Sequence, residues 1–259
     1  MTQFLDEVQL QKRAPSIFAT GGSQKTSERY GFIPTIEVVR GLRKNGFVPV
    51  MAGQSNSRLE HKKHFCKHIM RFRHESALMN KDLTPEIVLV NSHDRSTSYQ
   101  LRAGIYRTVC ANGMIVGDEV FCRRIKHSGY VIDRVVEAAN DLIEIVPMSV
   151  RKAEDWKEII LLPEHKEAFS EAAATLKWQE DNLPVDPRKL LVPKRIQDEK
   201  DDLWTTFNVV QENIIRGGIR YRNENGQRNR TREVQSVGEN VRLNTALWML
   251  TEKMAELVK

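Results

Sequence analysis

The fold is decided by three strand-like stretches: FVPVMAGQ (Phe47–Gln54), HFCKHIMRFRHE (His64–Glu75) and EIVLVNSH (Glu86–His93). Side chains alternate between the two faces of a strand, so the middle stretch has one apolar face and one cationic face. The third stretch is apolar on both faces, which is typical of a covered central strand. The pattern predicts an antiparallel β-meander sheet of three or more strands.

The remainder of the chain favours helices that cover this sheet, and the C-terminal half is predicted to be helical. The fold class is therefore α+β. Apolar residues at helical spacing predict helices at Thr35–Lys44, Ala103–Ala111, Tyr130–Val146, Val150–Leu161, Pro163–Gln179, Asp198–Arg216 and Gly238–Val258. Asn112-Gly113 predicts a turn, and Met114–His127 is predicted to form a short hairpin.

Composition shifts divide the chain into four predicted segments. These are a flexible N-terminal segment (residues 1–29), an α+β core (30–180), a proline-rich linker (181–197) and a C-terminal helical pair (198–259) with an Arg-rich connecting loop (219–237).

The overall charge favours a polyanionic partner, because the 259-residue chain carries a formal net charge of +6. Cys66, Cys110 and Cys122 form no CxxC pair, which is typical of free thiols in a reducing cytoplasm. The N-terminus lacks the apolar core of a secretory signal, and no apolar run is long enough to span a bilayer. We therefore expect a cytoplasmic protein without a membrane anchor.

The predicted loop 219–237 is the first candidate for a binding site. Guanidinium groups bind phosphates through paired hydrogen bonds, and a tyrosine ring can stack on an unpaired base. The alternative is a solvated surface loop. The candidate residues are Arg216, Arg220, Tyr221, Arg222, Arg228, Arg230 and Arg232.

The cationic face of the middle strand is the second candidate. Positive charge aligned along a sheet is suited to following a phosphate backbone. The alternative is an ordinary solvated outer face. The residues on the strand are Lys67, Arg71 and Arg73, and those on the adjoining segment are Arg58, Lys62 and Lys63.

Two other kinds of site are weaker candidates. His61, His64, Cys66 and His68 are zinc-ligand types, but a second ligand pair is missing, and such residues beside Met70 and Phe72 are more often part of a core. His93-Asp94 and Asp118-Glu119 lie in polar turns where catalytic residues occur. No P-loop, GxSxG or HExxH motif is present, so we expect a non-enzymatic protein without a cofactor or metal.

Several segments resemble one uncharacterised family of plasmid and prophage proteins, the "domain of unknown function 932". The matching segments are ERYGFIPT (Glu28–Thr35), LRKNGFVPV (Leu42–Val50), KHIMRFR (Lys67–Arg73), PEIVLVNSHDRSTSYQL (Pro85–Leu101), VCANGM (Val109–Met114), DLWTTFNVVQEN (Asp202–Asn213), NRTREV (Asn229–Val234) and VRLNTALW (Val241–Trp248). The resemblance implies a mobile-element setting and no particular reaction. The order of elements is also similar to that of RecT and Red-beta single-strand annealing proteins, which implies a basic groove around Lys67, Arg71 and Arg73 and assembly into rings or filaments.

These observations predict a single-stranded-DNA-binding protein of a mobile element that contacts the phosphate backbone, with strand annealing as an extension of that activity. One alternative is an inhibitor of host defence that acts by binding a protein. A metal-dependent nuclease is the third.

Overall fold

The computed structural model describes residues 4–22, 32–57, 60–77, 83–94, 96–108, 112–117, 119–126, 131–178, 182–223 and 225–258. It divides into two compact units. Unit 1 comprises residues 1–149 and 236–238, and unit 2 comprises residues 150–235 and 239–259. The boundary at residue 149 differs from the predicted one at residue 180.

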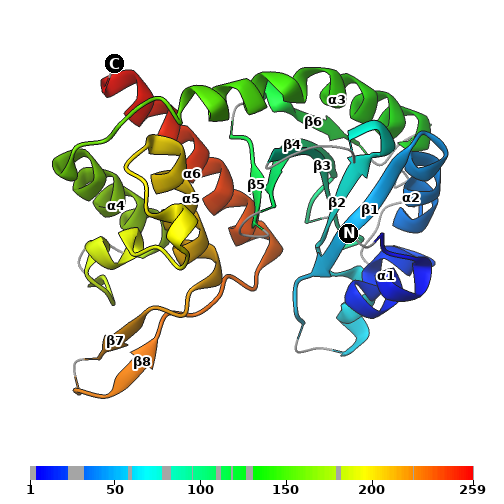
Figure 1. The fold of residues 1–259 in the computed structure, drawn as a ribbon. Coiled ribbons are helices and arrows are strands. Elements are labelled where there is room, and N and C mark those ends of the chain that lie inside the picture. The colour runs from blue at the N-terminus through cyan, green and yellow to red at the C-terminus, as the bar shows by residue number, and fades with distance from the viewer. Residues whose placement is uncertain are drawn as a thin grey trace. The chain divides into compact units, whose positions relative to one another are not determined.

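A six-stranded antiparallel sheet forms the centre of unit 1, and its strands follow the order β1-β2-β3-β4-β5, with β6 also paired to β4 (Figure 1). The predicted α+β class is therefore confirmed. The strands are β1 (Phe47–Gln54), β2 (His68–His74), β3 (Leu83–Asn91), β4 (Tyr99–Arg107), β5 (Asn112–Ile115) and β6 (Cys122–Ile125).

The first strand matches its predicted bounds, whereas β2 begins only at His68 because the short 3-10 helix η2 (Glu60–Phe65) precedes it. The helix predicted at Ala103–Ala111 is wrong, since residues up to Arg107 belong to β4. A short apolar run has no period that separates a buried strand from a buried helix, and pairing with β3 decides the outcome.

The hairpin predicted at Met114–His127 is also wrong. Strands β5 and β6 each pair with β4 and not with each other. The Asn112-Gly113 dipeptide begins β5 rather than forming a turn. Gly113 has another role there, because a Cβ at this position would lie 2.6 Å from Cζ of Arg71.

Unit 1 contains α1 (Glu7–Arg13), α2 (Thr35–Lys44) and most of α3 (Val131–Asp155). Helix α2 matches its prediction. A single helix, α3, continues past Pro147 where two were predicted. Helix α1 lies in the segment predicted to be flexible, and its Leu10 is fully buried. Gly41 lets α2 approach α3, since a Cβ there would lie 2.6 Å from Cγ2 of Ile132.

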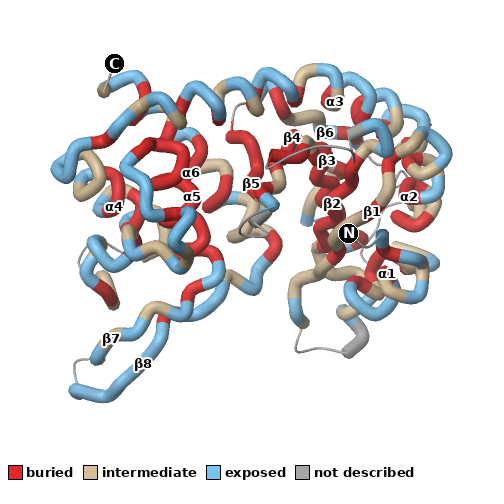
Figure 2. Tube along the Cα trace, viewed as in Figure 1, coloured by how far each residue is buried: buried red, intermediate tan, exposed pale blue. Residues whose placement is uncertain are grey.

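Unit 2 is built from helices and one small two-stranded sheet. Its elements are α4 (Pro163–Lys177), α5 (Leu203–Arg216), β7 (Arg220–Arg222), β8 (Arg228–Arg230) and α6 (Val237–Leu257). Every residue of α5 before Arg216 is buried (Figure 2). The ring of Phe207, on α5, packs against those of Trp156 and Trp248, whose centroids are 4.7 Å apart.

The proline-rich segment predicted to be an extended linker packs against α5 instead. It contains the short 3-10 helices η6 (Pro187–Leu191) and η7 (Ile196–Asp198). The buried amide of Asn213 donates hydrogen bonds to the carbonyls of Leu190 and Val192. In the part of the chain that the structure describes, every helix is too short or too polar to cross a membrane.

Candidate nucleic-acid interface

The predicted Arg-rich loop contains a β-hairpin, β7–β8, which we call the arginine ribbon (residues 220–230). Arg220 pairs directly with Arg230, and Arg222 pairs with Arg228. Because directly opposed residues share a face and successive residues alternate, all four arginines of the two pairs lie on one face. Tyr221 and Asn229 form the opposite face.

The arginine pairs occupy the sites where opposed side chains approach each other most closely. The main-chain amide of Thr231 donates to the carbonyl of Ile219 at 2.9 Å. The main-chain amide of Asn223 donates to the carbonyl of Gln227 at 3.0 Å. Hydrogen-bonded and non-hydrogen-bonded pairs alternate in an antiparallel ladder, so Arg220–Arg230 and Arg222–Arg228 are the non-hydrogen-bonded pairs. Like charges in direct opposition destabilise a hairpin.

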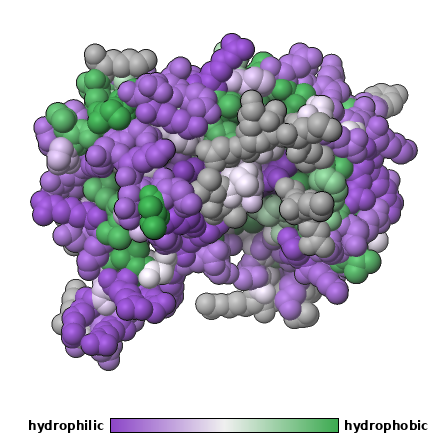
Figure 3. Space-filling model, viewed as in Figure 1, coloured by the Kyte–Doolittle hydropathy of each residue, from purple (hydrophilic) through white to green (hydrophobic). Residues whose placement is uncertain are grey.

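The four arginines are exposed, and the hairpin appears as a hydrophilic projection of unit 2 (Figures 2 and 3). Among the described residues, no carboxylate forms a salt bridge with any of them. The guanidinium of Arg222 makes one hydrogen bond, of 3.3 Å, to the carbonyl of Gly226. The ribbon therefore presents concentrated positive charge that the described part of the protein leaves uncompensated.

The base of the ribbon is held firmly to the helices of unit 2. Gly217 (φ 63°) adopts a left-handed conformation and leaves no space for a Cβ, which would lie 2.6 Å from the carbonyl oxygen of Thr231. The amide of Gly218 donates to the same carbonyl at 2.8 Å. Nζ of Lys177 donates to the carbonyls of Ile214 and Arg232, which joins the last turn of α5 and the segment after β8 to the end of α4.

Further basic residues lie near the ribbon base in sequence or in contact with it. Nζ of Lys189 is 3.4 Å from the carbonyl oxygen of Arg220. The carboxylate of Glu212, only 5% exposed, accepts hydrogen bonds from both Arg195 and Arg216 and lies 4.0 Å from Nζ of Lys194. Glu212 thereby holds three basic side chains in one cluster beside the last turn of α5.

Electrostatics within this cluster shift two pKa values. Burial raises the pKa of Glu212, but the hydrogen bond from Arg195 and the charges of Lys194, Arg195 and Arg216 outweigh it, so the pKa lies below the usual value. Burial, with the charges of Arg216 and Arg195, lowers the pKa of Lys194 against the opposing effect of Glu212.

The prediction that β2 presents an accessible cationic face is wrong, because the arginines on that face are buried. Arg71 is 5% exposed and Arg73 is 4% exposed. Both bind the fully buried carboxylate of Glu86, at 3.0 and 2.8 Å. Arg71 also donates to the carbonyls of Gly113 and Met114, and the guanidinium of Arg73 lies 4.0 Å from the ring centroid of Tyr106. These arginines are structural and are not available to phosphates.

The other predicted basic residues have separate environments. Lys62 is exposed, whereas Lys63 and Lys67 are half-buried. Arg58 lies outside the described residues. Arg232 is exposed just after β8, and Tyr221 is half-buried on the ribbon face opposite the arginines. A base stacked on Tyr221 would therefore lie on the ribbon face opposite the four arginines.

Two of the histidines considered as metal or catalytic residues, His68 and His93, join a buried polar cluster in unit 1. Oγ1 of Thr35 lies 3.0 Å from Nε2 of His68, 3.0 Å from Nε2 of His93 and 3.1 Å from Nδ2 of Asn91. All four side chains are fully buried. Because Asn91 donates and a hydroxyl has one proton and two acceptor sites, one imidazole donates to Thr35 and the other accepts from it.

Of the remaining residues of those two candidate sites, Cys66 meets this cluster through its main-chain carbonyl oxygen, 3.2 Å from Nδ1 of His68. Cys66 donates its thiol proton to the carbonyl of Lys62, and His64 is exposed. The His61 and Glu119 side chains and Asp118 lie outside the described structure. Within the described residues, no group of three or more histidine, cysteine or acidic side chains is placed to hold a metal ion.

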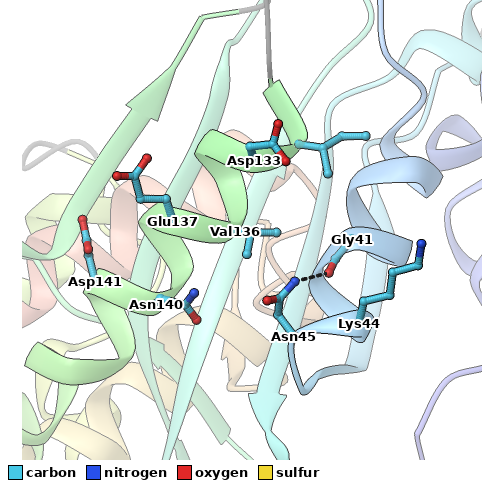
Figure 4. A pocket seen from close by; sticks show the side chains of 9 residues that line it. Gly41, Lys44, Asn45, Asp133, Val136, Glu137, Asn140 and Asp141 are labelled. Atoms are coloured by element: carbon cyan, nitrogen blue, oxygen red, sulfur yellow. Dashed lines mark hydrogen bonds between the residues drawn. The ribbon is translucent and has the colours of Figure 1, made fainter.

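A shallow cavity of about 570 Å³ lies between α2 and α3 in unit 1 (Figure 4). Lys44 at the end of α2 and the following Asn45 line one side, and Asp133, Glu137 and Asp141 of α3 line the other. The carboxylates follow one stripe of α3 at spacings of four residues, and they do not form a metal cluster. The cavity offers no set of groups suited to binding a polyanion.

Sequence reasoning missed the basic residues of the η6–η7 segment, because prolines led to its interpretation as a spacer. The only available signal was the density of positive charge, from Arg188, Lys189, Lys194 and Arg195 within eight positions.

Comparisons with known proteins identify a family and two similar proteins. A family model described as "Domain of unknown function (DUF932)" matches residues 24–248. Two proteins of Escherichia coli (strain K12), UPF0380 protein YafZ and UPF0380 protein YfjQ, are each 38% identical to this chain over 250 residues, covering 96% of this chain and 91% of the relative. No solved structure matches the chain.

Proposed function

We infer a function from the premise that this chain belongs to the DUF932 family, whose description states no activity, and we propose that it binds single-stranded DNA through the phosphate backbone. The arginine ribbon is the observation that supports this proposal. Binding involves no bond-making or bond-breaking step, so the proposed activity is non-enzymatic.

The ribbon contributes little to a hydrophobic core, since its arginines and Asn229 are exposed and Tyr221 is half-buried. An isolated two-stranded hairpin is marginally stable in water, and opposed arginines weaken it further. A bound polyanion would relieve the repulsion between these arginines. Phosphodiesters supply both negative charge and the oxygen acceptors that guanidinium groups bind in pairs.

Single-stranded DNA fits this site better than a duplex does. The arginine face offers no aromatic ring and no amide side chain for reading bases, so contacts to the backbone dominate. A single strand can bend to follow a short ribbon, whereas a duplex resists bending over such distances. We therefore expect binding with little sequence preference and with a strong dependence on salt concentration.

Fluorescence anisotropy with a labelled oligonucleotide, single-stranded or annealed to its complement, tests the proposal. The test variant replaces Arg220, Arg222, Arg228 and Arg230 with Gln. The matched control replaces four exposed arginines from elsewhere, Arg13, Arg124, Arg134 and Arg151, and therefore removes the same charge.

We expect wild type and control to bind the single strand at low salt and the ribbon variant to bind at least about tenfold more weakly. Equal weakening of both variants would show that only net charge matters. Absence of wild-type binding, or tighter binding of the duplex, would contradict the proposal.

A further inference from the structure

We propose that the arginine ribbon holds two consecutive phosphates of one strand, one at each directly opposed pair of arginines. We call these pairs the inner rung (Arg220 and Arg230) and the outer rung (Arg222 and Arg228). This inference rests on the proposed function and specifies how many phosphates the site binds and which arginines contact each one.

Each rung is suited to a single phosphate because the main-chain atoms of its two arginines are close together. The Cα atoms of a non-hydrogen-bonded antiparallel pair are about 4.5 Å apart, and the side chains project from the same face. A guanidinium group has five N–H donors, and a phosphodiester exposes two unesterified oxygens. Two guanidinium groups approaching from opposite strands can therefore bind one phosphate from both sides.

The separation between the rungs favours neighbouring phosphates. The rungs are two residues apart along each strand, which corresponds to about 6.7 Å. An extended sugar–phosphate backbone spans a comparable distance between one phosphate and the next. The ribbon face consequently matches the repeat of a single extended strand that runs parallel to β7 and β8.

The hairpin fixes this register at both ends. At the base, the Ile219–Thr231 hydrogen bond and the left-handed Gly217 set the inner rung. At the tip, the side chain of Asn223 accepts from the amide of Gln227 at 2.8 Å and donates to the Gln227 side chain at 3.1 Å. Gly226 (φ 72°) completes the turn. The rungs are therefore set in place before a ligand binds.

Double variants of equal charge distinguish this arrangement from simple electrostatic attraction. The rung variants Arg220→Gln/Arg230→Gln and Arg222→Gln/Arg228→Gln each empty one rung. The strand variant Arg220→Gln/Arg222→Gln removes one arginine from each rung and leaves both rungs half occupied. All four substituted positions are exposed, and circular dichroism checks that each variant retains the wild-type fold.

The readout is the dissociation constant of a labelled single-stranded oligonucleotide, measured over a series of salt concentrations. The slope of log K against log salt counts neutralised phosphates, at about 0.7 per phosphate for single strands. Each rung variant should lose about 0.7 from this slope. The strand variant should bind more weakly than wild type but keep the wild-type slope, because both phosphates remain in contact.

Equal slopes for the rung and strand variants would overturn the two-rung arrangement. So would loss of slope in the strand variant alone. Either result can occur while the wild-type protein binds the oligonucleotide normally, so a failure of this inference is distinguishable from a failure of the proposed function, in which wild type itself does not bind.

Discussion

Arg73 and Glu86 form an ion pair inside the sheet of unit 1, with Nη2 of Arg73 2.8 Å from Oε1 of Glu86 and neither side chain more than 5% exposed. Arg71 shares the same carboxylate at 3.0 Å. One buried negative charge is thus shared by two positive charges on the strand that the sequence suggested as a DNA-binding surface.

Replacement of Glu86 with Gln should strongly destabilise unit 1, because it leaves two guanidinium groups buried without a counter-charge. We expect the free energy of unfolding to fall by about 3–5 kcal/mol. Urea denaturation measures this change. Glu37→Gln is the matched control, since Glu37 pairs with Arg40 at the surface and should contribute less than about 1 kcal/mol. A loss at position 86 as small as that of the control would contradict the assignment.

Glu212 should make unit 2 sensitive to acid. Its pKa in the folded protein lies below the ordinary value of 4.5, so its contribution to stability is complete above about pH 4.5 and is lost as the pH falls through the folded-state pKa. Glu212→Gln should cost about 1–3 kcal/mol at neutral pH. Unfolding measured from pH 7 to pH 3 should show the two proteins converging at low pH. A constant difference across this range would argue against the ionised carboxylate as the cause.

The hydroxyl of Thr35 should contribute more to stability than its methyl group. Thr35→Val conserves shape but deprives Asn91, His68 and His93 of a hydrogen-bonding partner, at about 1–3 kcal/mol for each group left unsatisfied. Thr35→Ser keeps the hydroxyl and removes one methyl group, at about 1 kcal/mol. Thermal and urea unfolding should rank wild type first, Ser second and Val last. A valine variant as stable as the serine variant would be inconsistent with the hydrogen-bonded cluster.

Gly113 should tolerate no side chain. A Cβ would lie 2.6 Å from Cζ of Arg71, and that guanidinium cannot easily move because it binds Glu86 and two main-chain carbonyls. We expect Gly113→Ala to cost about 1–3 kcal/mol. Gly53→Ala provides the comparison, since its nearest neighbour would be 4.0 Å away. Stability assays that find both alanine variants equal would refute the close packing over Arg71.

Local pattern was sufficient to predict several elements of this fold. Alternating apolar residues after Asn45-Gly46 predicted β1 to the residue, and the spacing of Ile36, Val39 and Leu42 predicted α2. Where a run was short and apolar, as at Ala103–Ala111, period alone could not separate strand from helix.

The site was harder to predict because burial depends on partners distant in sequence. Alternation correctly placed Arg71 and Arg73 on one face, yet the carboxylate that binds them comes from the next strand, and Gly113 comes from another strand again. The ribbon was predicted as a loop because arginine and asparagine give no strand pattern. Its chemistry was visible in the sequence, but the pairing of arginines was not.

The hydrogen bond of 2.9 Å between Ser16 and Nδ1 of His68 has a practical consequence for anyone cloning this protein. Trimming the gene to start where the family match begins, at residue 24, would delete that serine together with the buried Leu10 and Ile17. The truncated product would expose the apolar surface that these residues cover, and His68 would lose a hydrogen-bonding partner. Aggregation of such a fragment during expression would then result from the loss of residues 1–23 and not from low solubility of the intact protein.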